Sequence, residues 1–174
     1  MFRYSVMAVT GVVLLIVTVL LVGSWLPVKH QVTRQATYRA TSAQLFALIR
    51  NVSDYPSWQK AVSKVEVLPE VNGKERMRET NRGQAVTYEL GDIVPNQRMV
   101  SRIVDDKLPF GGSWTYELIP GPSADTTTLR ITENGEVYNP IFRFVSRFVM
   151  GHSATIDKYL DAVATRYPRL PGAS

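Results

Sequence analysis

Few residues in this chain could carry metal or acid–base chemistry. It has no cysteine, and its two histidines, His30 and His152, stand far apart with no second histidine at ligand spacing. Thiolate metal sites, disulfides and a cysteine nucleophile are therefore excluded. Motifs for a zinc site, a phosphate loop or a nucleophilic serine are also missing. We expect neither a metal nor a cofactor.

His152 is the candidate for proton transfer. It falls on the apolar stripe of a predicted C-terminal helix, where it could face a cavity and hydrogen-bond a ligand or move a proton. The alternative is a histidine packed at the helix edge with satisfied ring nitrogens. Because no partner is identifiable beside it, the sequence assigns no catalytic residue and favours a protein that is not an enzyme.

Aromatic side chains recur along the predicted strands and the C-terminal helix. They could line a cavity or fill an ordinary core, since rings bury a large area in either case. The predicted ligand-binding cavity is lined by Trp58, Tyr88, Trp114, Tyr116, Phe148, His152 and Tyr159. Four glutamates alternate with apolar residues, which predicts outward, solvated positions for Glu75, Glu79, Glu89 and Glu117.

The elements that position these residues follow from local patterns. Thr41 and Gln44 form a capping-box pattern that predicts a helix to about Asn51. Ser53 or Asp54 could then cap another helical turn. Alternating segments separated by short turns predict an antiparallel meander with strands at 31–39, 64–68, 74–80, 84–94, 97–104, 114–118 and 126–137. A spacing of three or four predicts a long amphipathic helix over 139–167, which Gly151 can bend.

The N-terminal segment Val6–Trp25 contains no charged residue and is dominated by Val, Leu, Ile, Met and Ala. About 20 such residues suffice to cross a bilayer, so we predict a membrane-spanning helix. The alternative is a cleaved signal peptide with Arg3 as its basic start. The short positive N-terminus favours an extracytoplasmic domain, whereas Lys29 and Arg34 beyond the helix favour the opposite side.

Charge composition excludes one class of partner. The chain has 20 Lys and Arg against 15 Asp and Glu, a net charge of +5, but these basic residues are scattered along the sequence. A nucleic-acid-binding domain usually gathers them into a patch. We therefore expect no nucleic acid partner.

The order of elements and several local motifs resemble a known superfamily. The motifs are the 41–51 helix, the Asp54–Trp58 segment, the Gly112–Glu117 strand and the Glu133–Pro140 segment. Together they resemble the START-like helix-grip fold, in particular the SRPBCC or polyketide cyclase/dehydrase-like superfamily, over about 32–166. The resemblance implies an α+β fold in which a curved antiparallel sheet of about seven strands wraps around a long C-terminal helix. It also implies binding of lipids, polyketides, steroids or other apolar molecules between sheet and helix.

These observations predict three parts: an anchor at 1–28, a START-like domain at 29–168 and a disordered tail at 169–174. The leading functional hypothesis is a membrane-anchored module that binds a hydrophobic small molecule or lipid. One alternative is a cyclase- or dehydratase-like enzyme that uses the same cavity. The other is a structural or interaction protein whose cavity is filled by its own side chains.

Overall fold

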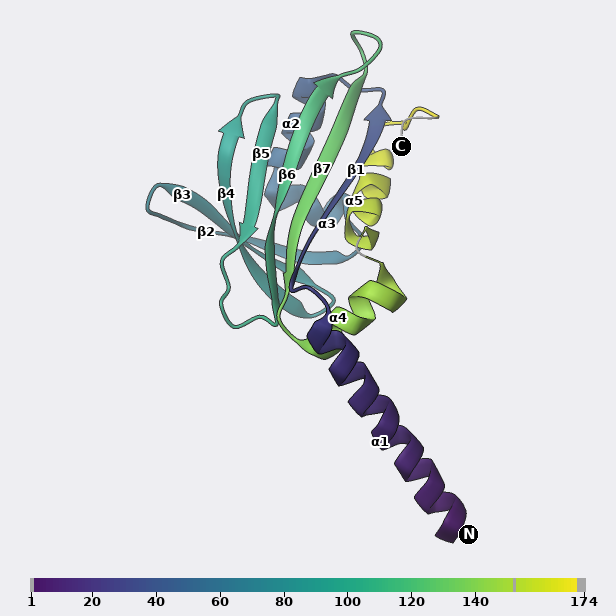
Figure 1. The fold of residues 1–174 in the computed structure, drawn as a ribbon. Coiled ribbons are helices and arrows are strands. Elements are labelled where there is room, and N and C mark those ends of the chain that lie inside the picture. Colours follow the sequence, from purple (N-terminus) through teal and green to yellow (C-terminus); the bar gives the residue numbers. More distant parts are fainter. Residues whose placement is uncertain (1, 152, 172–174) are drawn as a thin grey trace.

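The computed structural model describes residues 2–151 and 153–171, except for the side chains of residues 2–6, 8, 9 and 150. Its first element, α1 (Phe2–Trp25), projects away from the rest of the chain as a single straight helix (Figure 1). Most of its described apolar side chains are exposed, including Leu14, Leu15 and Leu21.

Among the residues that the structure describes, no helix combines the length and the apolar character that crossing a bilayer requires. The helical conformation of the Val6–Trp25 segment is confirmed, but its assignment as a membrane-spanning helix has no structural support. The side chains of Val6, Ala8 and Val9 belong to the predicted span and lie outside the described residues.

The seven strands form one antiparallel sheet in the order β1-β7-β6-β5-β4-β3-β2 (Figure 1). The tight hairpins at Asn72-Gly73 and Arg82-Gly83 have two residues with positive φ, as type I′ turns require. The predicted strands are confirmed, although the sixth begins earlier than the sequence pattern indicated. Their bounds are β1 (Lys29–Tyr38), β2 (Val62–Val71), β3 (Lys74–Asn81), β4 (Gln84–Val94), β5 (Arg98–Ile103), β6 (Phe110–Pro120) and β7 (Thr127–Val137).

Two short helical segments follow β1. The capping box of α2 (Ser42–Arg50) is confirmed: the Thr41 amide donates to Gln44 Oε1 at 2.8 Å, and the Gln44 amide donates to Thr41 Oγ1 at 3.3 Å. The 3₁₀ turn η1 (Val52–Asp54) and α3 (Tyr55–Trp58) come next. The expectation of a side-chain cap here was wrong, since neither segment has a capping hydrogen bond.

The C-terminal helix is not one long rod, which corrects the sequence prediction. It consists of α4 (Pro140–Val145), the π-helical turn η2 (Ser146–Met150) and α5 (Ala154–Ala164). Gly151 separates them with φ 75° and ψ 143°, a conformation that only glycine adopts without strain. The amphipathic period continued across Gly151 in sequence, so periodicity alone could not reveal the break.

The break sends the two pieces to different neighbours. α5 and α2 pack against the concave face of the sheet and complete the core, with Leu45, Ile156 and Leu160 nearly inaccessible to solvent. α4 instead packs against the C-terminal end of α1 (Figure 1). There Gly23 meets the Pro140 backbone so closely that any added Cβ would clash, and Arg143 Nη1 donates to the Leu26 carbonyl at 2.8 Å.

The C-terminal segment begins with backbone pairing to β1. The Arg39 amide donates to the Pro168 carbonyl at 2.9 Å, and the Leu170 amide donates to the Thr37 carbonyl at 2.8 Å. The predicted disordered tail therefore starts with two residues that the sheet edge holds. Residues 172–174 of that tail lie outside the described residues.

Candidate functional site

Cross-strand register sets which side chains face the helices. Trp114 stands opposite Ser101 and Glu133, Tyr88 opposite Met77, and Glu79 opposite Val86. Because residues paired across strands share a face, all of these side chains lie on the concave surface. The arginines that alternate with them on β3, Arg76 and Arg78, lie on the convex surface.

The concave face divides into two halves by burial. The half under α2 and α5, here called the closed half, is inaccessible to solvent and consists of Ala36, Tyr38, Leu90, Met99, Leu118 and Leu129. The other half, toward the end of the sheet near α1, is here called the open half. Five of its side chains keep partial solvent contact: Val32, Glu79, Tyr88, Ile103 and Trp114. Their cross-strand neighbours Met77, Val86, Ser101 and Glu133 are buried.

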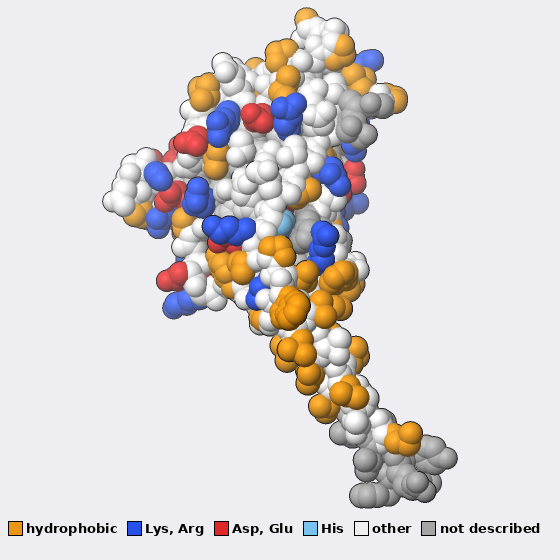
Figure 2. Space-filling view, viewed as in Figure 1, with side chains coloured by type: hydrophobic (Ala, Val, Ile, Leu, Met, Phe, Trp, Pro, Cys, Tyr) orange, Lys and Arg blue, Asp and Glu red, His pale blue; other side chains and the backbone are white. Residues whose placement is uncertain are grey.

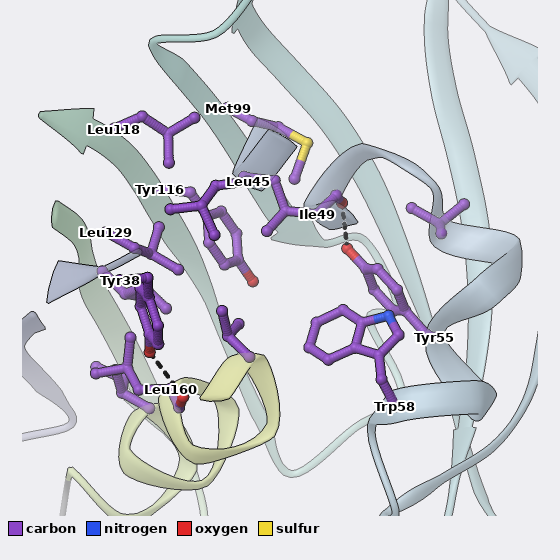
Figure 3. Close-up of a cluster of buried hydrophobic side chains, with 14 of the residues drawn as sticks. Tyr38, Leu45, Ile49, Tyr55, Trp58, Met99, Tyr116, Leu118, Leu129 and Leu160 are labelled. Atoms are coloured by element: carbon purple, nitrogen blue, oxygen red, sulfur yellow. Dashed lines mark hydrogen bonds between the residues drawn. The ribbon is translucent and has the colours of Figure 1, made fainter. Parts of the chain in front are cut away.

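Four aromatic rings run across the boundary between the halves. The Tyr55, Trp58, Tyr159 and Tyr116 rings follow one another with centroid separations of 5.4 Å at each step. In the close-up, Trp58 of α3 and Tyr116 of β6 point toward each other from opposite sides of the core (Figure 3). Edge-to-face contacts at this separation stabilise the packing beyond simple burial.

A polar group is buried among the rings of the open half. Trp114 packs edge-on against Tyr88 at 6.0 Å, and its Nε1 donates to Glu133 Oε2 at 2.9 Å. The other carboxylate oxygen of Glu133 lies 3.4 Å from His30 Nε2, and Glu133 is only 8% exposed. Burial lowers the pKa of His30, which favours a neutral ring at neutral pH. These contacts fix the Glu133 carboxyl and the Trp114 ring together.

Glu79 is the second carboxyl of the open half. It makes no hydrogen bond or ion pair with any side chain that the structure describes, and burial raises its pKa to about 7. Burial raises the pKa values of four tyrosines from α3, β4, β6 and α5, and the charge of Glu79 adds to this effect. They are Tyr55, Tyr88, Tyr116 and Tyr159. Glu79 therefore faces a ring of phenols and is half neutral near pH 7.

One hydrogen-bond donor at the boundary, Trp58 Nε1, is inaccessible to solvent and has no acceptor in the described part of the chain. The Tyr159 hydroxyl is also inaccessible to solvent, and it interacts with the Tyr55 hydroxyl. Tyr55, the neighbour of both rings, donates its own proton to the Ile49 carbonyl at 2.7 Å (Figure 3). Burial raises the pKa of Tyr159 well above its ordinary value, so its hydroxyl stays protonated. Unsatisfied buried donors are unusual, because each costs stability.

The structure brings together most of the predicted cavity residues. Trp58, Tyr116 and Tyr159 meet at the boundary, while Tyr88 and Trp114 pair in the open half. Phe148 does not join them: it is 59% exposed and packs on Phe144, because the break at Gly151 turns its helix away. His152 lies outside the described residues, so its predicted role stays a prediction.

The sequence analysis did not single out Glu133 as part of the site, and it misplaced two other carboxyls. Glu79 and Glu75 were expected on the solvated face, but they share the concave face with Met77, and Glu75 binds Arg50 at 2.7 Å. Glu89 and Glu117 do lie on the convex face, where arginines neighbour them. The missed signal was Met77, an apolar residue among charges, which marks the inward register of β3.

Two further hollows lie outside this region. The larger, about 580 Å³, lies between the 102–106 segment and the start of β6; the second, about 500 Å³, lies beside Lys29 and Gln31. Asn134 and Glu136 line both hollows, and their side chains belong to β7. Of the predicted cavity residues that the structure describes, none lines either hollow.

Comparisons with known proteins place the fold. The START superfamily protein from Mycobacterium smegmatis is 17% identical, with a TM-score of 0.64 over 79% of this chain and 96% of that protein. The Zhui aromatase/cyclase from Streptomyces sp. R1128 is also 17% identical, with a TM-score of 0.63 over 79% of this chain and 93% of that one. The protein TTHA0849 from Thermus thermophilus gives 17% identity and a TM-score of 0.63, with 79% and 96% coverage.

These likenesses support the α+β, START-like fold that the sequence predicted, with a curved seven-stranded antiparallel sheet. No curated protein matches the sequence. The family described as polyketide cyclase / dehydrase and lipid transport matches residues 29–167, which is most of the chain. The chain therefore belongs to the polyketide cyclase / dehydrase and lipid transport family.

Proposed function

We propose that this protein binds a hydrophobic small molecule or lipid on the open half of its concave face. The observation that carries this proposal is the contrast in burial across one sheet. Aromatic side chains of the open half, Tyr88 and Trp114, keep solvent contact although they face inward, whereas the closed half is fully packed. An inward face of aromatic rings with a few polar groups is typical of small-molecule sites.

The family supports the same proposal. Its description joins cyclases and dehydrases with lipid transport, so its members share a fold that handles apolar molecules. At 17% identity, the solved structures support the fold alone and do not identify the ligand. The choice of binding over another role therefore rests on the site.

We further propose that the protein contacts a lipid bilayer through α1, with residues 29–168 on the extracytoplasmic side. Hydrophobic side chains gather along α1 and continue onto the segment where it meets α4 (Figure 2). The exposed residues of that segment are Tyr138, Ile141, Phe142, Phe148 and Val149. A contiguous apolar surface of this kind marks a partner or a membrane. A bilayer would supply apolar ligands beside the open half.

Lipid mass spectrometry of the purified full-length protein tests the binding proposal. Organic extracts should contain one apolar species enriched over detergent blanks. Tyr88→Arg, which places a charge in the open half, should remove that species, because burying an unpaired charge against an apolar ligand is costly.

The matched control is Thr87→Arg on the same strand. Thr87 pairs with Arg78 on the convex face, so this variant changes the charge equally and leaves the open half intact. Retention in Thr87→Arg with loss in Tyr88→Arg supports the site. Equal retention in both variants would place the ligand elsewhere, and an extract without any enriched species would favour a protein whose concave face stays without ligand.

Bilayer contact is tested separately by flotation with liposomes. The full-length chain should float with vesicles and resist extraction by alkaline carbonate. A chain that stays at the bottom of the gradient would contradict the role of α1.

An acid–base enzyme is the second candidate function, and Glu79 is the observation that favours it. A carboxyl with a pKa near 7 is suited to give and take a proton at neutral pH. In a dehydration, neutral Glu79 would protonate a departing hydroxyl, which leaves as water. The carboxylate would then accept the proton from the adjacent carbon as the C=C bond forms. Two proteins whose solved structures share this fold are the aromatase/cyclases Zhui and StfQ.

Glu79→Gln separates the two candidate functions. Glutamine keeps the size of the side chain and cannot transfer a proton. Loss of a product that the wild-type chain forms from a bound β-hydroxy ketone, with unchanged binding of that ketone, would support the enzyme. No turnover by the wild-type chain of a ketone that it binds would leave binding as the function.

A further inference from the structure

The segment formed by α4 and η2 presents apolar side chains to solvent. Ile141 and Phe142 are exposed, and so are Phe148 and Val149, each seven residues further along. Seven residues span about two helical turns, so these side chains lie on one side of the segment. No residue of α4 is buried. The segment therefore has an apolar stripe that the described part of the chain does not cover.

The contact between α4 and α1 fixes the position of this apolar stripe. Gly23 of α1 meets the backbone of Pro140, where α4 begins. Arg143 Nη1 also donates to the Leu26 carbonyl, just beyond the end of α1. Trp25, the last residue of α1, is exposed, and tryptophan favours the membrane–water interface. Hydrophobic side chains gather at this junction (Figure 2). If α1 contacts a bilayer as proposed, the apolar stripe lies at the level of the headgroups.

Two arginines of the same segment have no carboxylate to pair with. Arg143 and Arg147 lie on successive turns, and the sequence has no Asp or Glu between Glu136 and Asp157. In the described part of the chain, neither guanidinium forms an ion pair, and Arg143 Nε is inaccessible to solvent without an acceptor. Lys29, at the start of β1, is by contrast paired with Glu136 at 3.4 Å. The α4–η2 segment therefore carries two positive charges that the described chain leaves unbalanced.

The stripe and the arginines together indicate a partner that is apolar in one part and anionic in another. A soluble anion would pair with the guanidinium groups but leave Phe142 and Val149 in water. A bilayer of zwitterionic lipids would cover the stripe but bring no net negative charge to Arg143 and Arg147. An anionic phospholipid does both, because its phosphate accepts from a guanidinium while its acyl chains cover the apolar side chains.

We propose that α4 and η2 lie along the membrane surface and bind anionic phospholipid headgroups through Arg143 and Arg147. This rests on the proposed function, because it takes α1 to contact a bilayer. It adds a second bilayer-contacting element, the class of lipid and the residues that select it. Basic side chains at a membrane surface gain affinity from anionic lipids and lose it as salt screens the attraction.

Fluorescent probes on single cysteines test this proposal, since the chain has no cysteine of its own. The full-length protein is labelled at Val149→Cys in the stripe, Leu15→Cys in α1, or Ala124→Cys. Ala124 lies in the turn between β6 and β7, at the end of the sheet away from α1 (Figure 1). Each labelled protein is reconstituted with vesicles of phosphatidylcholine, either alone or with one third phosphatidylglycerol. Lipids with a nitroxide on the acyl chain quench a probe that contacts the bilayer.

The probe at position 149 should be quenched about threefold more strongly, or more, when phosphatidylglycerol is present, and high salt should reduce this ratio. The probe at position 15 should be quenched in both kinds of vesicle, and the probe at position 124 in neither. These three positions separate contact through the stripe from contact through α1.

Substitutions of the arginines identify the groups that select the lipid. In the protein labelled at position 149, Arg147→Gln should lower the ratio, and it changes an exposed side chain that the fold does not need. Adding Arg143→Gln should bring the ratio close to one. The control combines Arg39→Gln with Arg98→Gln, which removes the same charge at the opposite end of the sheet from α1 and should leave the ratio unchanged.

The outcomes separate this inference from the proposed function. Equal quenching at position 149 in both kinds of vesicle, unchanged by the arginine variants, would overturn the selection of anionic lipid. Quenching at position 15 without quenching at position 149 would mean that another partner covers the stripe, so the inference would fail while contact through α1 stands. If neither probe is quenched, the proposed bilayer contact fails together with the inference.

Discussion

The closed and open halves of the concave face are parts of one sheet, but their polar side chains differ in how completely they are hydrogen-bonded within the chain. In the closed half, the Tyr38 hydroxyl donates to the Leu160 carbonyl at 2.7 Å, so a strand and a helix complete each other's hydrogen bonds. In the open half, Glu79 has no hydrogen-bond or ion-pair partner in the described chain, and at the boundary the Trp58 indole N–H has no acceptor there. The polar groups of the closed half are therefore hydrogen-bonded within the chain, whereas those of the open half and its boundary are satisfied only in part.

The helices above the sheet explain the difference. α5 lies on the closed half, where Ile156, Leu160 and Val163 are almost completely buried. On the N-terminal side of Gly151, α4 packs on α1, and the Phe142 side chain of α4 is 50% exposed. A continuous helix would have covered more of the sheet. The break at Gly151 therefore separates a packed region from a partly uncovered one.

The largest expected loss of stability comes from creating a cavity in the closed half. Leu129 is fully buried, and Leu129→Ala should lower the free energy of unfolding by about 3 kcal/mol, since the cavity it leaves cannot collapse fully. Ile103→Ala, in the open half, should cost about 1 kcal/mol, because its side chain already meets solvent. Urea unfolding of the full-length chain measures both, and equal losses would contradict the division into halves.

The second effect is the pH dependence that Glu79 introduces. Its pKa is about 7 in the folded chain and near the ordinary 4.5 in the unfolded one, so the folded state holds a proton that the unfolded state has lost. The free energy of unfolding should therefore fall as pH rises from 4.5 to 7, by about 2–3 kcal/mol from this group. Glu79→Gln should remove this component, as urea unfolding at a series of pH values would measure.

The other titratable groups around Glu79 do not change the difference in pH dependence expected between wild type and Glu79→Gln. The facing tyrosines, Tyr55, Tyr88, Tyr116 and Tyr159, have pKa values raised above their ordinary range and stay neutral throughout. His30, whose pKa is lowered by burial, contributes equally to wild type and variant. Parallel pH profiles for wild type and Glu79→Gln would show that Glu79 is solvated in the native state.

The third effect tests the break between the halves. Gly151→Ala places a Cβ on a residue with φ 75°, and the strain should cost about 1–2 kcal/mol. Hydrogen exchange should quicken in α4 and remain unchanged in α5. Gly91→Ala is the control, because Gly91 has an ordinary φ and open space around it. A fully tolerated Gly151→Ala would mean that the connection adapts without strain.

Local sequence patterns predicted much of the fold, because they report local physics. The capping box at Thr41 and the alternation from Gln84 to Val94 were both found where predicted. It was harder to predict which face of β3 points inward, because five of its eight residues are charged and only Met77 marks the inner face. Burial of Glu79 depends on neighbouring strands, so β3 alone could not reveal it.

Local sequence patterns also predicted part of the candidate site. Aromatic residues indicated the concave face, because large rings are seldom left in solvent. The packing of Tyr159 on Trp58 and Tyr116 joins α5, α3 and β6, which meet only in the fold. The position of Phe148 depended on one glycine, whose positive φ has no signature in hydrophobic periodicity.

The smallest expected effect concerns the polar contact that fixes the open half. Trp114→Phe keeps a ring against Tyr88 and removes the Nε1 donor to Glu133, so stability should fall by about 1 kcal/mol. Tyr88→Phe is the matched control, because it keeps the ring pair and removes a hydroxyl that makes no hydrogen bond with the described part of the chain. It should change the free energy of unfolding by less than about 0.5 kcal/mol. Thermal unfolding of the two variants measures the difference. If Trp114→Phe lowers stability no more than Tyr88→Phe does, then His30 and the neighbouring chain fix the position of Glu133 without Trp114. The Trp114–Glu133 hydrogen bond would then contribute little to stability, and packing on Tyr88 would account for the position of the Trp114 ring.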